Sequence, residues 1–466
     1  MTPKRFPDRD EIADVRAEAD ALENEAEGSE TRRLAGRVLA RRDMGKLVFL
    51  DLVDRSGRIQ LLCPSARTGE VDVHMGDIVG AIGKPTKSRR GEPSLIVDEL
   101  VLLARIRSPL PDTFHGLTDV EQRYRRRYLD LLMNEETRST FVLRARIVAA
   151  IRRFLDADGF IEVETPVLQS RYGGAFAEPF VTHHNQLDQD LYLRIATELY
   201  LKRLIVGGLE RVYELGKDFR NEGVNYKANP EFTMVEWYEA YADYQDTMRR
   251  IENLIEYVAL ETLGTTKTAF RGHEVDLKVP WRRMRLVDEL KELDLWTEDF
   301  DDLKSRLEAR SVDVSQDKTW AQLVDKAVTA YIEPRLIEPT ILYDYPIELS
   351  PFARVTDDDP RVVERFEYYV GGMELGNAFT ELNDAEEQAQ RFSLQAEEGA
   401  GGNVEAEQGD PEYVEALSYG MPPTGGIGLG IDRLTMVLAG KDSIRDVILF
   451  PAQRPTPAAT PGSGVR

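Results

Sequence analysis

Residues 218–232, DFRNEGVNYKANPEF, carry side chains whose types and spacing suit nucleotide chemistry. Arg220 and Glu222 are two residues apart, so in a β-strand both would project from one face. The planar fork of an arginine in a cleft can clamp a phosphate. Phe232 offers a stacking surface for a base, and Lys227 in the loop can reach outer phosphates. This stretch predicts an ATP site; a surface ion pair on an ordinary sheet is the open alternative.

Residues 365–382, RFEYYVGGMELGNAFTEL, combine a turn with two carboxylates. Gly371 and Gly372 between two strand-like runs are a two-residue hairpin signal. That hairpin makes Glu367 a diagonal neighbour of Glu374. Carboxylates this close repel each other unless a cation lies between them, and Mg²⁺, held by a few carboxylates and nucleotide phosphates, fits the arrangement. Two solvated surface glutamates are the alternative.

The strand after this turn raises a register problem. Asn377, Phe379 and Glu381 share one face, whereas strict alternation places Glu374 on the other. A β-bulge adds one residue and reverses the alternation, and glycine is a frequent place for one. We therefore predict a bulge at residues 375–376, which brings all four side chains to the same side.

A glycine-rich run at 422–440, PPTGGIGLGIDRLTMVLAG, predicts a strand that leads into a helix. Arg433 lies at the start of that helix. The glycines permit a close approach of the backbone to a ligand. The run lacks the Gly-Lys-Ser/Thr of a P-loop, so it predicts no Walker-type phosphate site.

The composition limits the other kinds of chemistry. Cys63 is the only cysteine, which excludes an internal disulfide framework and a cysteine-rich zinc site. Five histidines make histidine-based chemistry a poor candidate. The net charge is −23, yet residues 31–110 hold 15 Lys/Arg against 9 Asp/Glu. A basic module on an acidic body can direct a polyanion to one end; a chance fluctuation of surface charge is the alternative.

The chain of 466 residues is long enough for two or three domains. Five short alternating segments separated by turn signals predict a five-stranded OB-fold β-barrel. The rest predicts a mainly antiparallel β-sheet flanked by helices, so the expected class is α+β. The expected parts are an acidic arm at 1–30 (an exposed helix or disordered), the barrel at 31–107, a linker at 108–122, a catalytic domain at 123–455 and a disordered tail at 456–466.

The chain has no run of eighteen or more apolar residues. Its N-terminus, MTPKRFPDRDEIADVR, lacks the apolar segment of a signal peptide. These two features predict a cytoplasmic protein without a membrane partner.

Three stretches resemble motifs 1, 2 and 3 of the class II aminoacyl-tRNA synthetases: GFIEVETP, FRNEG with NPEFT, and GGIGLGIDR. The barrel resembles the anticodon-binding domain of their aspartate/asparagine/lysine subgroup. HGLTDVEQRYRRRYLDL, GNAFTELNDAEEQAQRF and IRDVILFPAQRP are similar to the lysyl-tRNA synthetases. The likeness runs from about residue 34 to 455. It implies ATP-dependent ligation of L-lysine to tRNA(Lys) through a lysyl-adenylate, with release of AMP and pyrophosphate.

The resemblance implies a nucleotide site with Mg²⁺. Arg220 would bind the α-phosphate and the substrate carboxylate, Arg433 would bind the γ-phosphate, and Phe232 would stack on adenine. Arg220, Glu222 and Arg433 form the implied catalytic set. The remaining implied ATP ligands are Lys227 and Asn229, together with Glu367 and Glu374 as the ligands of Mg²⁺. The loop departs from the family at Ala228, where relatives usually have a histidine, so one potential phosphate contact is missing.

The resemblance also implies a lysine site and an anticodon site. The implied lysine-binding residues are Gly174 and Glu198 for the α-amino group, Asn377 and Arg220 for the carboxylate, Glu236, Tyr238 and Glu381 for the ε-ammonium, and Phe379 along the aliphatic stem. The implied anticodon-binding residues are Arg41, Phe49, Gln60 and Glu99.

The charges of these residues agree with a cationic substrate. A pocket that holds both Glu236 and Glu381 favours an ammonium group, and one ion pair at ~4 Å in a partly wet site is worth about 4 kcal/mol before desolvation. An aspartate-specific pocket would need Arg or Lys at these positions. The competing hypotheses are a protein lysyl-transferase, whose relatives lack the barrel, and a non-catalytic tRNA-binding paralogue, which predicts loss of the charged site residues.

The resemblance further implies a homodimer formed by the motif 1 helix and strand. The helix has an apolar stripe of Phe141, Ile147, Ala150 and Phe154. The same stripe would suit a core within one chain, so the stripe alone leaves both alternatives open.

Overall fold

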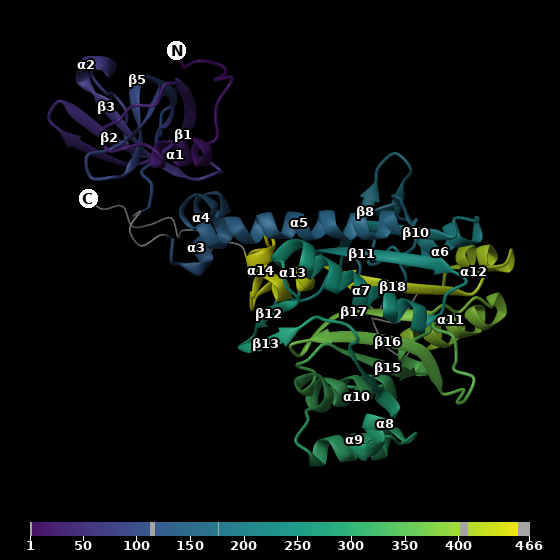
Figure 1. Cartoon of the computed structure of the whole chain (residues 1–466). Helices are drawn as coiled ribbons and strands as arrows, with labels where there is room; N and C mark the ends of the chain where they lie inside the picture. Colours follow the sequence, from purple (N-terminus) through teal and green to yellow (C-terminus); the bar gives the residue numbers. More distant parts are fainter. Residues whose placement is uncertain (1, 112–116, 176, 401–408, 455–466) are drawn as a thin grey trace, which may run out of the picture. The chain divides into compact units, whose positions relative to one another are not determined.

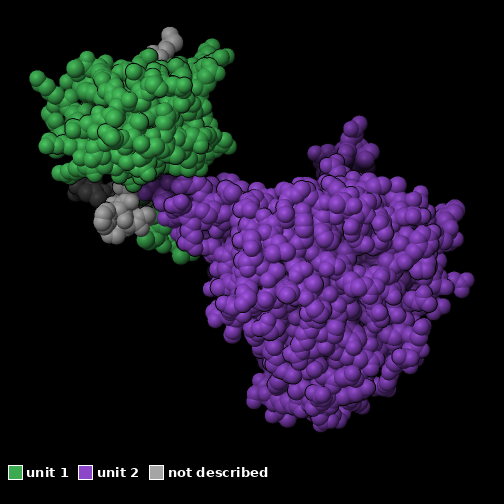
Figure 2. All heavy atoms as spheres, viewed as in Figure 1, with its two compact units in different colours: residues 1–120 green, residues 121–466 purple. Residues whose placement is uncertain are grey.

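The computed structural model describes residues 2–111, 117–175, 177–400 and 409–454. The chain divides into two compact units, one up to Val120 and one from Glu121 onward (Figure 2). The predicted tail at 456–466 and part of the predicted linker lie outside the described residues. The exact domain boundaries stay predictions.

The first unit contains the predicted five-stranded barrel. Its strands form a closed barrel in the order β1-β2-β3-β5-β4. Alternate side chains, such as Leu34, Leu50 and Leu61, point into one shared core inside the barrel. Neighbouring strands of the barrel are antiparallel in every pair except β3 and β5, which run parallel. The elements are β1 (Arg32–Met44), β2 (Leu47–Val53), β3 (Arg58–Pro64), α2 (Ser65–Thr68), β4 (Ile78–Lys87) and β5 (Pro93–Ala104).

The N-terminal segment differs from the expected arm. Helix α1 (Ile12–Asp20) buries Ile12, Val15 and Ala19, and Ile12 and Val15 belong to the barrel core. The acidic composition concealed this apolar i, i+3, i+7 face. Residues 12–20 therefore form part of the barrel unit instead of an exposed helix.

An eight-stranded sheet forms the centre of the second unit (Figure 1). Its order is β14-β15-β16-β17-β18-β11-β10-β6, and only the β6–β10 and β14–β15 pairs are parallel, as expected for a mainly antiparallel sheet. The strands are β6 (Ile161–Glu162), β10 (Arg211–Phe219), β11 (Glu231–Ala240), β14 (Arg282–Arg285), β15 (Thr340–Pro346), β16 (Val362–Val370), β17 (Met373–Thr380) and β18 (Thr424–Gly430).

Strand alternation gives this sheet one apolar face and one polar face. Val235 and Trp237 of β11 join a buried core with α5 (Glu135–Ala157), α7 (Tyr244–Leu263) and α13 (Ile431–Ala439). Ile147 and Ala150 of the motif 1 stripe belong to the same core, so that stripe packs within the chain. The opposite face of the sheet is left for the polar residues.

Smaller elements surround this sheet. No helix in the described ranges is long and apolar enough to cross a membrane. The remaining elements are α3 (Val120–Arg125), α4 (Arg127–Met133), β7 (Leu168–Gln169), β8 (Val181–His184), β9 (Gln189–Leu193), α6 (Glu198–Val206), β12 (Lys267–Phe270), β13 (His273–Asp276), α8 (Leu286–Glu292), α9 (Phe300–Ala309), α10 (Trp320–Ala327), η1 (Val328–Ile332), η2 (Glu333–Arg335), η3 (Ile347–Leu349), α11 (Ala385–Ala400), α12 (Pro411–Ser418) and α14 (Ile444–Val447).

The predicted hairpin and bulge are both present. Gly371 and Gly372 have φ values of 61° and 68°, as a two-residue turn of this hand requires. Tyr369 pairs with Glu374 and Tyr368 with Gly376, so one residue of β17 is extra. The bulge is confirmed, and it turns Glu374 to the polar face.

Candidate active site

The polar face of the sheet is organised in rows across neighbouring strands. Glu236 pairs with Gly428, Gly428 with Asn377, and Asn377 with Glu367. These residues share one face because paired residues of adjacent strands point the same way. The next row consists of Tyr238, Gly426, Phe379 and Arg365.

The glycines of β18 form the floor of this face. A Cβ on Gly426 would lie 2.0 Å from Glu381 Oε1 and 2.4 Å from the Tyr238 ring. A Cβ on Gly428 would lie 2.9 Å from the Met234 side chain. The glycine-rich run therefore makes room for side chains of the neighbouring strands, a role that its sequence alone did not specify.

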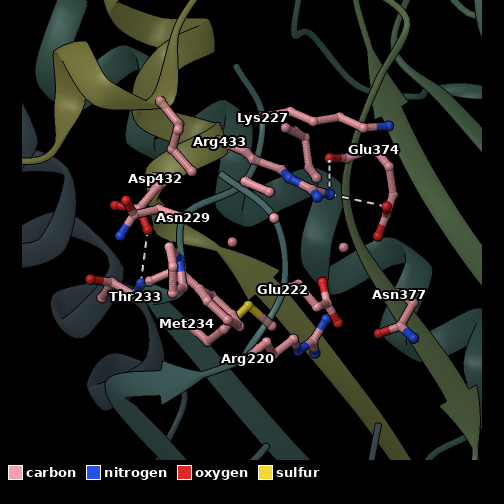
Figure 3. Close-up of a pocket in the computed structure, with 18 residues that line it drawn as sticks. Arg220, Glu222, Lys227, Asn229, Thr233, Met234, Glu374, Asn377, Asp432 and Arg433 are labelled. Carbon is pink, nitrogen blue, oxygen red and sulfur yellow. Dashed lines mark hydrogen bonds and ion pairs between the residues drawn. The ribbon is translucent and has the colours of Figure 1, made fainter. Parts of the chain in front are cut away.

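Two adjoining cavities open over the sheet. The first, of about 190 Å³, includes residues of the motif 2 loop and α13 (Figure 3). The second, of about 250 Å³, lies over β11, β16 and β17. Arg220, Met234, Glu374 and Asn377 line both cavities, so two ligands bound in them would meet at these four residues.

The first cavity contains most of the predicted nucleotide ligands: Arg220, Glu222, Lys227, Asn229, Phe232, Glu374 and Arg433. The expectation that Arg220 and Glu222 lie in a strand is wrong, because β10 ends at Phe219. Arg220 still faces the cavity, and its guanidinium lies 5.1 Å from the centre of the Phe232 ring. Ala228 also lines this cavity, where it adds no polar group.

Arg433 and Glu374 hold each other in the first cavity. Arg433 Nη1 donates to the Glu374 backbone oxygen at 2.9 Å and to its Oε2 at 3.0 Å (Figure 3). Burial acts against the charge of Glu374, but Arg433 and Lys227 outweigh it and lower the pKa of this carboxyl. Glu374 is therefore ionised at neutral pH.

Glu367 is more firmly bound by protein donors than Glu374. Arg365 Nη2 donates to Glu367 Oε1 at 2.6 Å, and the Tyr345 hydroxyl donates to Oε2 at 2.8 Å, with the Tyr369 hydroxyl as a further donor. Burial, opposed by Arg365, raises the pKa of Glu367, and the charge of Glu374 raises it further.

The two carboxylates fit a magnesium site in their chemistry. Both line the second cavity and repel each other, and their oxygens are the donors that Mg²⁺ prefers. Since Glu367 already accepts from three donors, Glu374 would be the freer ligand. Phosphate oxygens from a nucleotide would have to complete the coordination.

Asn229 lines the first cavity, and its side-chain amide is bonded to the protein backbone. Its Nδ2 donates to the Glu231 backbone oxygen at 2.6 Å, and its Oδ1 accepts from the Ala452 backbone at 3.1 Å. The side chain therefore ties the motif 2 loop to the C-terminal segment. It borders the cavity but is already engaged with the protein.

Asp432 and Arg144 form a connection that sequence reasoning missed. Asp432 Oδ2 accepts from the Thr233 backbone at 2.8 Å, and Oδ1 lies 2.6 Å from Arg144 Nη1 (Figure 3 shows the first contact). Arg144 lies on α5, so this network joins the three motifs directly beside Arg433. In the sequence, the position of Asp432 directly before Arg433 was the signal that could have indicated a role for Asp432 in the site.

The second cavity has an acidic end. Glu236 is buried and accepts from the Thr197 backbone at 3.4 Å and the Tyr238 hydroxyl at 3.3 Å. Among the described residues no cation pairs with it. Burial, together with Asp218 and Glu198, raises the pKa of Glu236 to about 8. A buried carboxyl in this state is prepared to receive a cation.

Glu198 and Glu381 share a lysine that sequence reasoning also missed. Lys202 Nζ lies 2.5 Å from Glu198 Oε1 and contacts Glu381 Oε2. The i, i+4 spacing of Glu198 and Lys202 on one helix could have indicated the first contact. Gly174 packs closely against Glu198: a Cβ added at Gly174 would lie only 3.0 Å from the Cβ of Glu198.

The barrel separates the predicted anticodon residues. Phe49 of β2 lies on the outer face of the barrel. Gln60 lies on the same face, because it pairs with Asp51, which is two residues after Phe49 in β2. Arg41 pairs with the inward-facing Leu50 and donates to Asp43 at 2.8 Å, so it lies on the other face. Arg42, opposite Phe49 and 5.9 Å from its ring centre, lies on the outer face.

Glu99 lies on β5, opposite Ile82 of β4. It is exposed on the barrel, and β3 separates its strand from Phe49 on β2. The roles of all four predicted anticodon residues stay predictions.

Comparison with known families agrees with this architecture. Residues 119–454 match the profile of "tRNA synthetases class II (D, K and N)", and residues 33–103 match that of an "OB-fold nucleic acid binding domain". The chain therefore belongs to the class II tRNA synthetases of the D, K and N family.

Within that family, several similar curated proteins carry the name lysine–tRNA ligase. The protein of Roseiflexus sp. (strain RS-1) is 50% identical over 441 residues, 92% of this chain and 90% of its own length. The protein of Halalkalibacterium halodurans is 47% identical over 97% of this chain and 92% of its own length. The protein of Bacillus subtilis (strain 168) is 48% identical over 90% of this chain and 86% of its own length.

Proposed function

We propose that this chain ligates L-lysine to tRNA(Lys) in an ATP-dependent reaction through a lysyl-adenylate. The observation that carries the proposal is the buried carboxyl of Glu236, which has no cationic partner among the described residues and lies in a cavity that adjoins the nucleotide cavity at Arg220. The names of the similar proteins support the same activity. An aspartate substrate fits poorly, because Lys202 is already paired with two carboxylates.

In the first step the lysine carboxylate attacks the α-phosphorus of ATP, and pyrophosphate leaves. Arg220 lines both cavities, so it holds the attacking carboxylate and the α-phosphate together. Phe232 stacks on the adenine, and Arg433 exchanges its contact with Glu374 for the γ-phosphate. Mg²⁺ bound by Glu374 and Glu367 would supply neutralisation of the phosphate charge. No general base is required, because the attacking carboxylate is already ionised.

In the second step the terminal ribose hydroxyl of the tRNA attacks the adenylate, and AMP leaves. The outer face of the barrel with Phe49 and Gln60 suits unstacked anticodon bases, because aromatic side chains stack on bases and amides read their edges. The positive excess of residues 31–110 supports an RNA partner for this unit.

The direct test of the proposed function is ATP–pyrophosphate exchange with Mg²⁺ and each of the twenty amino acids separately, without tRNA. We expect exchange with lysine alone. Silence with every amino acid, from protein whose fold is verified by circular dichroism, would favour the non-catalytic paralogue. Exchange with aspartate or asparagine would overturn the assigned substrate.

The raised pKa values predict how lysine recognition depends on pH. Burial raises the pKa of Glu236 and of Glu381 to about 8, so below pH 8 these carboxyls are partly protonated in the free enzyme. An ammonium group binds the ionised forms. We therefore expect kcat/KM for lysine to fall roughly tenfold per pH unit below pH 8 for each carboxyl that must ionise. ATP–pyrophosphate exchange measured with varied lysine at pH 6 to 9 checks this expectation. The KM for ATP over the same pH range is the control.

We further propose a cytoplasmic homodimer. Exposed apolar side chains on α5 (Val142), on β6 (Ile161), on β7 (Leu168) and just before β7 (Val167) support this. β6 is an edge strand of the sheet, so it also presents unpaired backbone groups. Light scattering of the purified protein would give twice the chain mass of 52.9 kDa if the dimer forms.

A further inference from the structure

Lys202 lies beneath the second cavity without lining it. Its side chain is fully buried, and the ammonium contacts Glu198, at 2.5 Å, and Glu381. The same ammonium lies 4.9 Å from the centre of the Phe352 ring. A buried ammonium is costly unless carboxylates compensate it, so the two glutamates and Lys202 depend on one another for their positions.

These two carboxylates come from separate elements. Glu198 begins α6, whereas Glu381 follows the end of β17. In the proposed function Glu198 receives the α-ammonium group of the substrate and Glu381 receives the ε-ammonium group. One buried cation therefore contacts the protein ligands of both ends of the amino acid.

The charge of the pocket also depends on Lys202. When ionised, Glu198 and Glu236 in the lining of the second cavity and Glu381 buried behind it provide three negative charges for the two ammonium groups of lysine. Lys202 cancels one of them, which leaves two. The net charge of Glu198, Glu236, Glu381 and Lys202 together is then −2, which matches the two positive ammonium groups of the substrate. Arg220 faces the substrate carboxylate.

We propose that Lys202 is a positioning residue for amino-acid selection, which fixes the carboxylates of Glu198 and Glu381 relative to each other and cancels one of the three negative charges of Glu198, Glu236 and Glu381. This inference rests on the proposed function. It assigns a specificity role to a residue that touches no substrate.

The competing explanation is an ion pair that only stabilises the fold, and the pH dependence of lysine recognition separates the two. Burial raises the pKa of Glu381 to about 8, and Lys202 opposes this rise. Without Lys202 that pKa moves higher still, so lysine recognition needs a higher pH. The titratable groups that face this cluster are Glu198 on α6, Glu381 after β17, Tyr413 on α12, and Glu236 and Tyr238 on β11.

The test compares Lys202→Met with the wild type in lysine-dependent ATP–pyrophosphate exchange over a range of pH. We expect the KM for lysine to rise at least about 30-fold near neutral pH, because the carboxylates lose their shared partner. The KM for ATP should stay within about threefold. The midpoint of the pH dependence of kcat/KM for lysine should move upward by roughly one unit.

A matched control is available in Arg127, another fully buried cation. It pairs with Asp130 at 2.5 Å on α4, outside both cavities. Arg127→Met should lower the melting temperature without moving the lysine KM or the pH midpoint. If Lys202→Met does not fold, Lys202→Gln, which keeps an uncharged NH₂ donor group, is measured in the same way.

The outcomes separate this inference from the proposed function. A Lys202 variant that retains the wild-type lysine KM and pH midpoint, and only loses thermal stability, overturns the positioning role. A wild-type enzyme that fails to activate lysine overturns the proposed function itself, and the positioning role with it. Wild-type activation of lysine with a raised KM and a shifted midpoint in the variant supports both.

Discussion

Replacing Arg220 by alanine is expected to lower lysine-dependent ATP–pyrophosphate exchange by roughly 10³-fold, since one preorganised charge at a reacting phosphate contributes 10²–10³ or more. Arg220 lines both cavities, so its loss affects the nucleotide and the amino acid together. Its contacts with the protein are few: Nε is 3.5 Å from the Ile195 backbone oxygen, and its guanidinium lies over Phe232. The fold should therefore be unaffected.

Two further variants make this prediction sharper. Arg220→Lys keeps the charge but loses the planar fork, so an intermediate rate is expected. Arg249→Ala removes an exposed arginine of α7 that pairs with Asp246 at 2.5 Å, and it should exchange at the wild-type rate. Thermal unfolding of all three checks the fold. An Arg220→Ala enzyme that keeps a third or more of the exchange rate would contradict the role assigned to Arg220.

Local patterns were sufficient to predict the parts of the site that lie within one strand or one hairpin. The bulge in β17 followed from parity alone, because Glu374 and Asn377 could share a face only if one residue was added. The turn at Gly371 and Gly372 followed from the two-glycine hairpin signal between two strand-like runs. Each of these predictions used residues that are close together in the sequence.

Two of the missed residues have partners that are far away in the chain. Lys202 meets Glu381 across 179 positions, and Arg144 meets Asp432 across 288. No periodicity links such pairs. Arg365 was within reach of local reasoning, because it lies two residues before Glu367 and shares its face.

Two local predictions were wrong for a different physical reason. Arg220 and Glu222 were expected in a strand, but β10 ends at Phe219 and the chain turns toward the Glu178 backbone, which accepts from Asn221 at 2.8 Å. In the N-terminal segment, the acidic side chains of α1 suggested exposure although its apolar face packs on the barrel. Tertiary contacts decided both cases.

Replacing Glu236 by glutamine is expected to lower kcat/KM for lysine by about 100-fold or more, because one ion pair in a partly wet site is worth up to about 4 kcal/mol before desolvation. The amide has nearly the shape of the carboxyl: its oxygen can still accept from the Thr197 backbone, and its NH₂ group can donate to the Tyr238 hydroxyl. ATP lies in the other cavity, so the KM for ATP should change little. The measurement is exchange at saturating ATP with varied lysine.

The same variant should be more stable than the wild type at alkaline pH. Burial raises the pKa of Glu236 from 4.5 to about 8 in the folded chain. The folded state therefore binds this proton more tightly than the unfolded state. The stability that the protonated carboxyl contributes is fully present below pH 4.5 and is lost as the pH rises from 4.5 through about 8. Glutamine has no such loss. We expect melting temperatures that agree near pH 4 and differ by a few degrees, in favour of the variant, at pH 9.

A gain in stability together with a loss of lysine recognition would identify Glu236 as a residue kept for binding at a cost to the fold. Glu239→Gln is the matched control on the same strand: Glu239 is paired with Arg250 at 2.8 Å and with Arg211 at 2.7 Å, outside both cavities. Because its carboxylate has cationic partners, its removal should not stabilise the fold at pH 9, and lysine activation should persist. If Glu236→Gln activates lysine as well as the wild type does, the ε-ammonium group binds elsewhere in the cavity, and the substrate assignment loses the carboxylate on which it rests.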